Sequence, residues 1–281
     1  LRLKPVDGTL WSAALDCEAF ADEHLTGLGQ HPNGFLNQKD CVIDLVQVNT
    51  EVCIPWVVSS RGCGLLWNHP GTGRVELAAN GTRWTADALQ EIDLWLTTAD
   101  TPAGLLANYA NATGHAPAFP EYASGFWQCK LRYQTQEELL EVAREHKRRA
   151  LPLSVIVADY FHWDKMGEWR FDPACWPDPD AMVAELKEMG VELMVSVWPP
   201  VNPGCSGFPE MEKRNLLLQS ERGVPATTRF VDTYQDEPLS LHHIDPTHPE
   251  ARNFLWKRIS EHYADKGIRI FWLDACEPEL K

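Results

Sequence analysis

The stretch Leu153-Ser154-Val155-Ile156-Val157-Ala158-Asp159 decides the fold of the second part of the chain, because it predicts a short buried strand that ends at a carboxylate. The same pattern returns twice, in apolar runs that end at Trp198 and at Asp274. Helical patterns lie between these runs. Apolar strands that alternate with amphipathic helices predict a parallel sheet covered by helices.

The helical segments have recognisable starts. Thr135 and Glu138 have the spacing of a capping box, in which the hydroxyl and the carboxylate each accept a free N–H group at a helix start. Pro179 and Pro249 suit the first turns of two further helices, and we expect the second of these to stop at Gly267. A short strand before the first helix brings the prediction to four strand units. An eight-stranded barrel needs about 250 residues, so we expect only the first half of one.

The first 118 residues have a different pattern. Short apolar or alternating runs recur, as at residues 41–46 and 54–58, and Gly, Asn and Pro turns separate them. This pattern predicts a β-sandwich, which ends with a short helix. A Pro-rich joint at residues 116–120 marks the boundary. We therefore expect a β-sandwich domain over residues 1–118 and four β/α units of a TIM barrel over residues 119–281.

Composition limits the classes of partner. The formal net charge is -15, and the longest basic cluster is Lys147-Arg148-Arg149, so we expect no binding of nucleic acid or of an anionic membrane. The chain has no run of 18 apolar residues, which excludes a membrane-spanning helix. Self-association as a homo-oligomer stays open. The sequence also leaves the compartment open, with the cytoplasm slightly favoured over secretion.

Metals and disulfides are not expected. The eight cysteines are scattered without a C-x-x-C pair, which argues against zinc and dithiol motifs and favours buried thiols over a disulfide framework. His242, His243 and His248 suggest a metal cluster, but His248 lies in a turn that leads into a helix. We expect neither a metal nor a cofactor.

The strand ends predict a site. In a sheet of parallel strands the carboxyl ends lie at one edge, so Asp159, Trp198 and Asp274 are expected to converge. Carboxylates accept protons from sugar hydroxyls, and sugar rings pack on aromatic faces. Aromatic residues are concentrated nearby: Tyr160, Phe161, Trp163, Trp169, Trp176, Trp198 and Trp272. Trp163, Trp169 and Trp176 are interpreted as packing residues, and an Asp after a strand can also serve as a turn or helix cap.

A glycosidase would need a pair of carboxyls. Retaining enzymes hold two of them about 5–5.5 Å apart, one as the nucleophile and one as the acid/base. Glu277 and Glu279 follow Asp274 closely, but as loop residues they are interpreted as solvated charges. The sequence motifs by themselves do not identify the second carboxyl.

Several segments together resemble glycoside hydrolase family 31, and the resemblance extends along nearly the whole chain. The matching segments are residues 27–34, 59–62, 66–68, 158–163, 171–179, 197–200 and 271–277. The family implies a mutarotase-like β-sandwich followed by a TIM barrel, and exo-acting, retaining hydrolysis of α-glycosides without a metal. It also implies that the acid/base comes from a later strand, beyond Lys281. The chain alone is therefore expected to be inactive.

The resemblance also implies roles for individual residues. Asp274 corresponds to the nucleophile, Asp159 to the Asp that binds the sugar in the −1 subsite, and Trp198 and Trp272 to walls of the pocket. Many α-xylosidases have Lys at the position of Trp272, whereas many α-glucosidases have Trp. We expect a retaining α-glycosidase for terminal α-linked xylose or glucose. An α-glucan lyase or transglycosylase on the same scaffold, and a non-catalytic carbohydrate-binding chain, remain alternatives.

Overall fold

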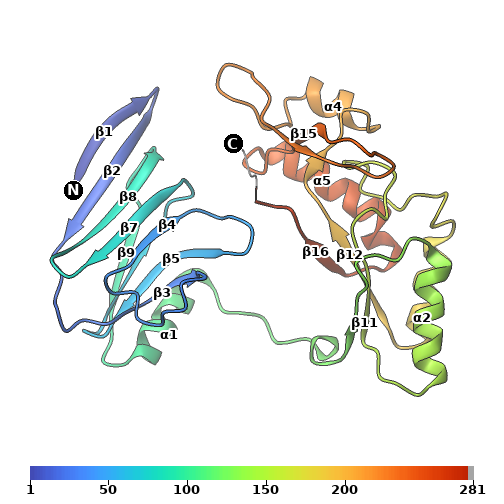
Figure 1. Cartoon of the computed structure of the whole chain (residues 1–281), viewed down its shortest axis with the longest axis horizontal. Coiled ribbons are helices and arrows are strands. Elements are labelled where there is room, and N and C mark those ends of the chain that lie inside the picture. The colour runs from blue at the N-terminus through green and yellow to red at the C-terminus, as the bar shows by residue number, and fades with distance from the viewer. Residues whose placement is uncertain (278–281) are drawn as a thin grey trace. The chain divides into compact units, whose positions relative to one another are not determined.

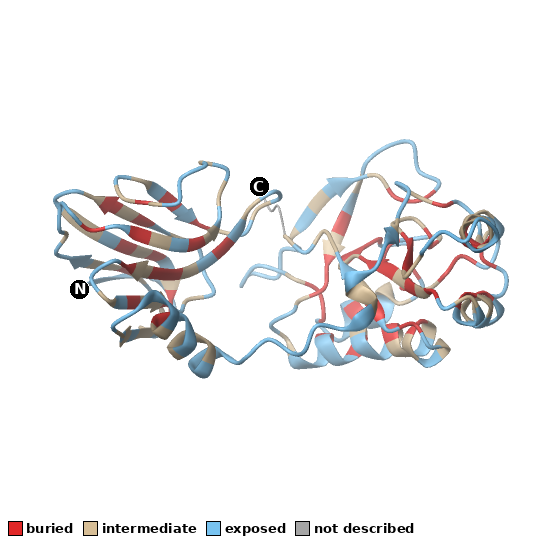
Figure 2. Ribbon diagram, turned by 90° about the horizontal axis from the view of Figure 1, so that it is seen from below, coloured by how far each residue is buried: buried red, intermediate tan, exposed pale blue. Residues whose placement is uncertain are grey.

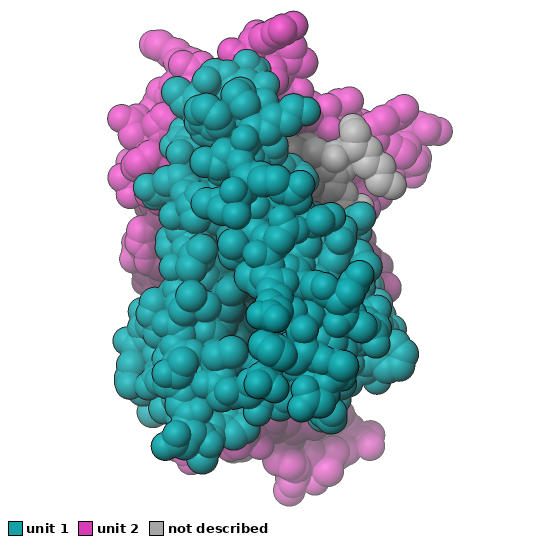
Figure 3. All heavy atoms as spheres, turned by 90° about the vertical axis from the view of Figure 1, so that its left-hand side faces the viewer, with its two compact units in different colours: residues 1–118 teal, residues 119–281 magenta. Residues whose placement is uncertain are grey.

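The computed structural model describes residues 1–277. The chain divides into two compact units, residues 1–118 and residues 119–281, which Figure 3 distinguishes by colour. Each unit has a hydrophobic core built from its own residues, and Figure 2 shows the buried positions in each. Within the described part of the chain, no helix is both long enough and apolar enough to cross a membrane.

The first unit consists of two antiparallel sheets and one helix (Figure 1). The strand orders are β1-β2-β8-β7-β4 and β3-β5-β6-β9. The bounds are β1 Arg2–Asp7, β2 Leu10–Cys17, β3 Leu25–Gln30, β4 Val42–Leu45, β5 Val52–Ser59, β6 Cys63–Trp67, β7 Gly73–Ala78, β8 Gly81–Leu89, β9 Leu94–Thr98 and α1 Pro102–Thr113. Both sheets contribute to one core, where the rings of Trp67 and Trp84 lie 6.2 Å apart.

The second unit contains a parallel sheet in the order β10-β11-β12-β16. Its bounds and those of its helices are η1 Glu121–Ser124, β10 Trp127–Gln128, α2 Gln136–Arg148, β11 Val155–Ala158, α3 Pro179–Glu188, β12 Glu192–Val197, α5 Pro249–His262, η2 Ala264–Lys266 and β16 Ile270–Leu273. The prediction of a parallel sheet with alternating helices is confirmed. Successive strands along the chain are also neighbours in the sheet, so their carboxyl ends lie at one edge.

A small antiparallel sheet between β12 and α5 was not predicted. It has the order β13-β15-β14. The bounds are β13 Pro200–Val201, α4 Phe208–Lys213, β14 Thr227–Phe230 and β15 Leu239–His243. β14 reads Thr-Thr-Arg-Phe and is mostly exposed, so it lacks the apolar alternation that would identify a strand. Main-chain pairing with β15 holds it in place.

Two helix boundaries differ from the predictions. At the start of α2, Thr135 Oγ1 accepts the N–H of Glu138 at 3.2 Å as expected, but the Glu138 carboxylate accepts the N–H of Gln134 at 2.7 Å instead of that of Thr135. α5 ends at His262, before the expected stop. The turn η2 fills the interval, and Gly267 adopts a left-handed φ of 94° after it.

The cysteines correct another expectation. All eight are free thiols, but only Cys53 and Cys205 are buried. Four are exposed, namely Cys17, Cys63, Cys129 and Cys276. These four lie at the ends of strands or just after them, where a side chain leaves the core. The interpretation of the cysteines as buried thiols is therefore wrong for this group.

The two faces of the parallel sheet have different roles. Side chains alternate between the faces of a strand. The core beneath the helices includes Ile156 and Ala158 of β11 and Leu193, Val195 and Val197 of β12. Residues from α2, α3 and α5 complete it: Leu139, Leu140, Ala143, Met182, Leu186, Ala251, Phe254 and Ile259. The opposite face therefore carries the side chains that alternate with these positions.

We predict that Ile156→Ala lowers the free energy of unfolding of the second unit by about 2–5 kcal/mol, because the side chain is fully buried beneath the helices. Ile156→Val should cost only about 0.5–1.5 kcal/mol. Urea unfolding followed by circular dichroism measures both. A loss below about 1 kcal/mol for the alanine variant would contradict the assignment of this face to the core.

Candidate active site at the carboxyl ends of the parallel strands

The helix-free face of the sheet gathers the predicted site residues. Val197 pairs with Leu273, and the N–H of Asp274 donates to the carbonyl of Val197 at 3.1 Å, so Trp198 and Asp274 follow directly on neighbouring strands. Ala158 pairs with Val195, which brings the position after β11 level with the end of β12. By strand alternation Asp159, Trp198, Trp272 and Asp274 all belong to the face opposite the helix-packed core.

The carboxylate of Asp159 is half-buried and held by two donors. Its Oδ1 accepts the N–H of Tyr160 at 2.7 Å, and its Oδ2 lies 3.7 Å from Cys129 Sγ. Burial raises the pKa of Asp159 above its ordinary value; the two donors oppose this rise, and the negative charge of Asp274 adds to it.

Cys129 is a site residue that sequence reasoning missed. It follows β10, the first strand of the sheet, and its thiol faces Asp159. Burial, the charge of Asp159 and the hydrogen bond to it raise the pKa of Cys129 to about 11. The thiol therefore stays protonated near neutral pH and serves as a donor. The short strand before it was predicted from the sequence, so its position directly after a strand end is the signal that could have pointed to it.

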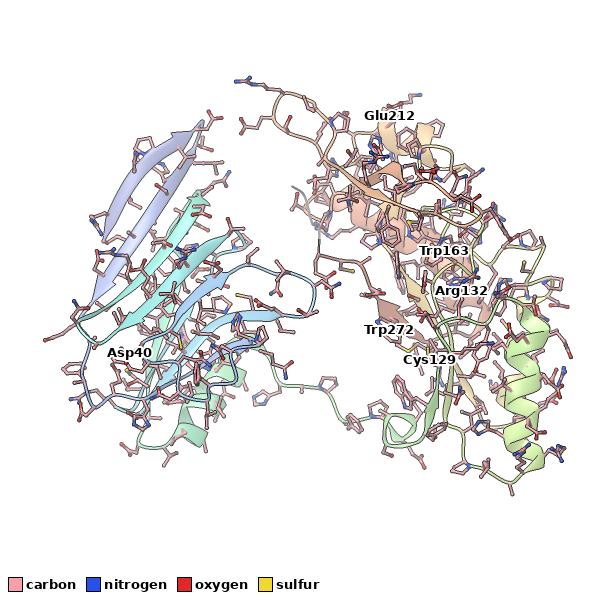
Figure 4. All side chains as sticks on the ribbon, viewed as in Figure 1. Asp40, Cys129, Arg132, Trp163, Glu212 and Trp272 are labelled. Carbon is pink, nitrogen blue, oxygen red and sulfur yellow. The ribbon has the colours of Figure 1, made fainter. Side chains whose placement is uncertain are left out.

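An aromatic wall continues from the strand ends. Trp198 stacks on Tyr160, with ring centroids 5.2 Å apart and planes inclined by 13°. Phe230 of β14 lies 5.8 Å from the Trp198 ring, and Phe161 lies 4.5 Å from the Tyr160 ring. Trp272, which is 41% exposed, belongs to β16, the strand that pairs with β12. Figure 4 labels Trp272 together with Cys129, and both lie at the sheet.

Three other tryptophans are packing residues, as predicted. Trp163, Trp169 and Trp176 are 3%, 2% and 1% exposed. Trp169 also supports the wall, because its Nε1 donates to the main-chain carbonyl of Trp198 at 2.9 Å. These rings are too deeply buried to stack on a ligand.

The turn after Asp159 is tightly held. Phe161 has a left-handed φ of 62°, which turns the chain back on itself. His162 then reaches the main-chain carbonyl of Asp159 with Nδ1 at 2.9 Å, and its Nε2 lies 2.8 Å from the hydroxyl of Tyr263. Burial lowers the pKa of His162 to about 4 and raises the pKa of Tyr263 well above its ordinary value. Both side chains are therefore neutral near pH 7.

Asp274 follows β16, an edge strand of the described parallel sheet. Asp274 is partly buried, and Ala275 after it has a left-handed φ of 51°. Cys276 Sγ lies 3.4 Å from the main-chain carbonyl of Asp274. Glu277 is partly buried, whereas Glu279 lies outside the described residues.

Two of the three histidines considered for a metal have separate hydrogen-bond partners, and the third, His242, packs edge-on against Phe208 with ring centroids 4.9 Å apart. His243 Nε2 lies 3.0 Å from Thr228 Oγ1, and the Nδ1 of His248 accepts the N–H of Glu250 at 3.1 Å at the start of α5. In the part of the chain that the structure describes, no group of three or more His, Cys, Asp or Glu side chains is placed to hold a metal ion. The strand-end carboxylates and aromatic rings suit a neutral, hydroxyl-rich ligand.

Comparison with known proteins identifies the family. Residues 116–281 match the family model described as "Glycosyl hydrolases family 31 TIM-barrel domain". The chain belongs to glycosyl hydrolase family 31. The resemblance found in the sequence motifs is thus confirmed, and the site described above lies within the matched residues of this family-31 chain.

Individual relatives extend the match to the first unit. The family-31 chain is 46% identical over 280 residues to a Pseudescherichia vulneris protein named "Uncharacterized family 31 glucosidase ORF2", and the match covers 100% of this chain and 52% of that protein. It is 34% identical to "Alpha-xylosidase A" of Aspergillus niger (strain ATCC MYA-4892 / CBS 513.88 / FGSC A1513), covering 97% of this chain and 37% of the relative.

A solved structure agrees closely. The crystal structure of a GH31 alpha-xylosidase from a soil metagenome, complexed with xylose, superposes with a TM-score of 0.93 at 49% identity, covering 100% of this chain and 40% of that one. The family-31 chain thus spans about half, or less, of the length of these relatives.

We predict that Asp159→Asn accelerates alkylation of Cys129 by iodoacetamide at pH 8.5 by about threefold to tenfold, since only the thiolate reacts. Removing the neighbouring negative charge lowers the pKa of Cys129 from about 11. Mass spectrometry of the modified peptides gives the rate in this chain without any assay of activity. The exposed thiol of Cys63, in the first unit, is the internal control. An unchanged rate at Cys129 would contradict the contact between its thiol and the Asp159 carboxylate.

Proposed function

We propose that a protein that contains this chain and has the length of its relatives is a retaining α-glycosidase. The observation that carries the proposal is the placement of Asp159 and Asp274 at the carboxyl ends of strands of one parallel sheet, on the helix-free face beside the Trp198–Tyr160 stack. Aromatic faces bind sugar rings, and strand-end carboxylates supply a nucleophile and acceptors for hydroxyl groups.

Asp274 is proposed as the nucleophile. Its carboxylate attacks the anomeric carbon while the bond to the departing oxygen breaks, and a covalent glycosyl-enzyme forms. Water then attacks the same carbon, and the second displacement restores the α configuration. Its position directly after β16, where the side chain is only partly buried, suits such an attack.

Asp159 is proposed as a residue that binds sugar hydroxyls in the −1 subsite. β12 separates β11 from β16, so the main chains of Asp159 and Asp274 are two strand spacings, or roughly 10 Å, apart. The family resemblance implies that the acid/base comes from a later strand, so it is proposed to come from the part of the relatives that this chain does not span.

The proposed substrate is a terminal α-linked xyloside, with an α-glucoside as the second choice. Support comes from the relatives named α-xylosidase and from the similar structure complexed with xylose. Trp198 and Trp272 are proposed as walls of the sugar pocket. Transglycosylation would share the glycosyl-enzyme and would differ by yielding products that contain an added acceptor.

The parallel sheet is proposed as the first half of a TIM barrel that follows a mutarotase-like β-sandwich. The name of the matching family model supports this proposal. β10 and β16 are the edge strands of the described sheet, and a barrel would pair both.

Stereochemistry provides the test of the mechanism. Proton NMR of the first sugar released from an aryl α-xyloside should show the α anomer before mutarotation. In an inverting enzyme the two carboxyls lie about 6.5–9.5 Å apart, and one of them activates a water on the far face of the sugar. Initial release of the β anomer would therefore overturn the proposal and make Asp159 the partner of Asp274.

We predict that Asp274→Ala, in a protein of the relatives' length, lowers kcat by about 10⁴–10⁶-fold, because the covalent route is removed. Azide added to this variant should attack from the vacated face and yield the β-glycosyl azide. Initial rates and NMR of the product measure the two effects. Unchanged turnover would exclude Asp274 as the nucleophile.

We predict that Asp159→Asn lowers kcat/KM by about 10–10²-fold, because hydrogen bonds to sugar hydroxyls strengthen in the transition state. Activity should still fall as the pH rises through the pKa of the general acid, since that acid is a different residue. The pH dependence of kcat/KM checks this. Loss of the high-pH limb, with recovery on substrates that have better leaving groups, would identify Asp159 as the acid.

We predict that the 281-residue chain alone hydrolyses neither aryl α-xylosides nor aryl α-glucosides. General acid–base catalysis contributes roughly 10²–10⁴-fold, and the strand-end carboxyls are assigned to other roles. Parallel assays of this chain and of a chain of the relatives' length make the comparison. Saturable hydrolysis by the short chain, abolished by Asp274→Ala, would require an acid/base within it, and Glu277 would be the first candidate.

A further inference from the structure

A buried hydrogen-bonded pair connects α5 to the strand-end carboxylate. His162 and Tyr263 are each 1% exposed, and 101 positions separate them in the sequence. His162 also contacts the main chain of Asp159. The link therefore runs from the end of α5, through one imidazole ring, to the residue proposed to bind the sugar.

The chemistry of the partners fixes the protons in this link. The carbonyl oxygen of Asp159 can only accept, so His162 Nδ1 carries a proton and donates at 2.9 Å. The ring is neutral because burial lowers its pKa to about 4. Nε2 is therefore an acceptor, and the hydroxyl of Tyr263 donates to it at 2.8 Å. This hydrogen bond requires Tyr263 to remain protonated, which agrees with its raised pKa.

We propose that His162, held in one tautomer by Tyr263, is a positioning residue that fixes the main chain of Asp159 and thereby aims its carboxylate into the sugar site. The inference rests on the proposed function. Asp159 lies where the regular strand has ended and the chain turns through the left-handed Phe161. The ladder of the sheet no longer holds its carbonyl, and His162 replaces that support.

The other contacts of Asp159 hold its side chain, and His162 holds its main-chain carbonyl. The N–H of Tyr160 and the thiol of Cys129 act on the carboxylate and determine its rotation about the side chain. Neither one contacts the carbonyl. A displacement of the main chain would move the carboxylate together with the turn, and misplacement by about 1 Å can cost about 10²-fold in rate.

Two amide variants of His162 distinguish a positioning role of this side chain from a packing role. In His162→Asn the amide nitrogen replaces Nδ1 and retains the donor to the Asp159 carbonyl, while the partner of Tyr263 is lost. In His162→Gln the amide replaces Nε2 and retains a partner for Tyr263, while the donor to Asp159 is lost. Each variant removes one buried hydrogen bond, so both should lower the melting temperature by similar amounts.

The kinetic test uses a protein of the relatives' length. Relative to wild type, His162→Asn should keep kcat/KM within about threefold, whereas His162→Gln should lose about 10–10²-fold. In the Asp159→Asn background, His162→Gln should cost less than about threefold more, because the two residues act as one unit. Equal losses in the two amide variants, or additive losses in the double variant, would overturn the positioning role.

A spectroscopic measurement separates failure of this inference from failure of the proposed function. In the present chain, ¹⁵N NMR should show His162 as the Nδ1–H tautomer, and Tyr263→Phe should mix the two tautomers. A wild-type enzyme without turnover would contradict the proposed function and remove the inference with it. Normal turnover together with an Nε2–H tautomer in wild type would contradict the inference alone.

Discussion

The alternation of side chains across the parallel strands is the constraint on which the rest of the second unit depends. In β11 and β12, one set of side chains packs beneath α2, α3 and α5, and the other set faces the helix-free side. A shift of one residue in β12 would turn Leu193, Val195 and Val197 away from the helices and bring the alternate side chains, Ser196 among them, into the core. Packing of the helices therefore fixes which residues belong to the site.

The site combines an aromatic surface with partly buried carboxylates, and hydrogen bonds stabilise the carboxylate of Asp159. Asp159 accepts a main-chain N–H and a thiol, so its charge is supported even though burial raises its pKa. Trp198 joins the two parts, because it follows the strand between Asp159 and Asp274 and stacks on Tyr160. A neutral sugar matches this surface, since its ring faces are apolar and its hydroxyls donate to carboxylates.

Much of this arrangement could be predicted because each strand carries its own local signal. Asp159, Trp198 and Asp274 could be placed at one edge from three apolar runs, and the family motifs gave Asp274 its expected role. Cys129 and the His162–Tyr263 pair were not found in this way. The strand before Cys129 was predicted, but its end was not counted among the strand ends of the site, and the His162–Tyr263 pair joins positions 101 apart through side chains alone. β14 was missed because it is polar and held by main-chain pairing.

The account depends most directly on the identity of the nucleophile. A fluorinated xylosyl fluoride that forms the glycosyl-enzyme quickly and releases it slowly would trap the intermediate in a protein of the relatives' length. Peptide mapping by mass spectrometry would then locate the added sugar. The account predicts one sugar on the peptide that contains Asp274, attached to that side chain. A sugar attached to Glu277, to Asp159 or to a carboxyl elsewhere would contradict it.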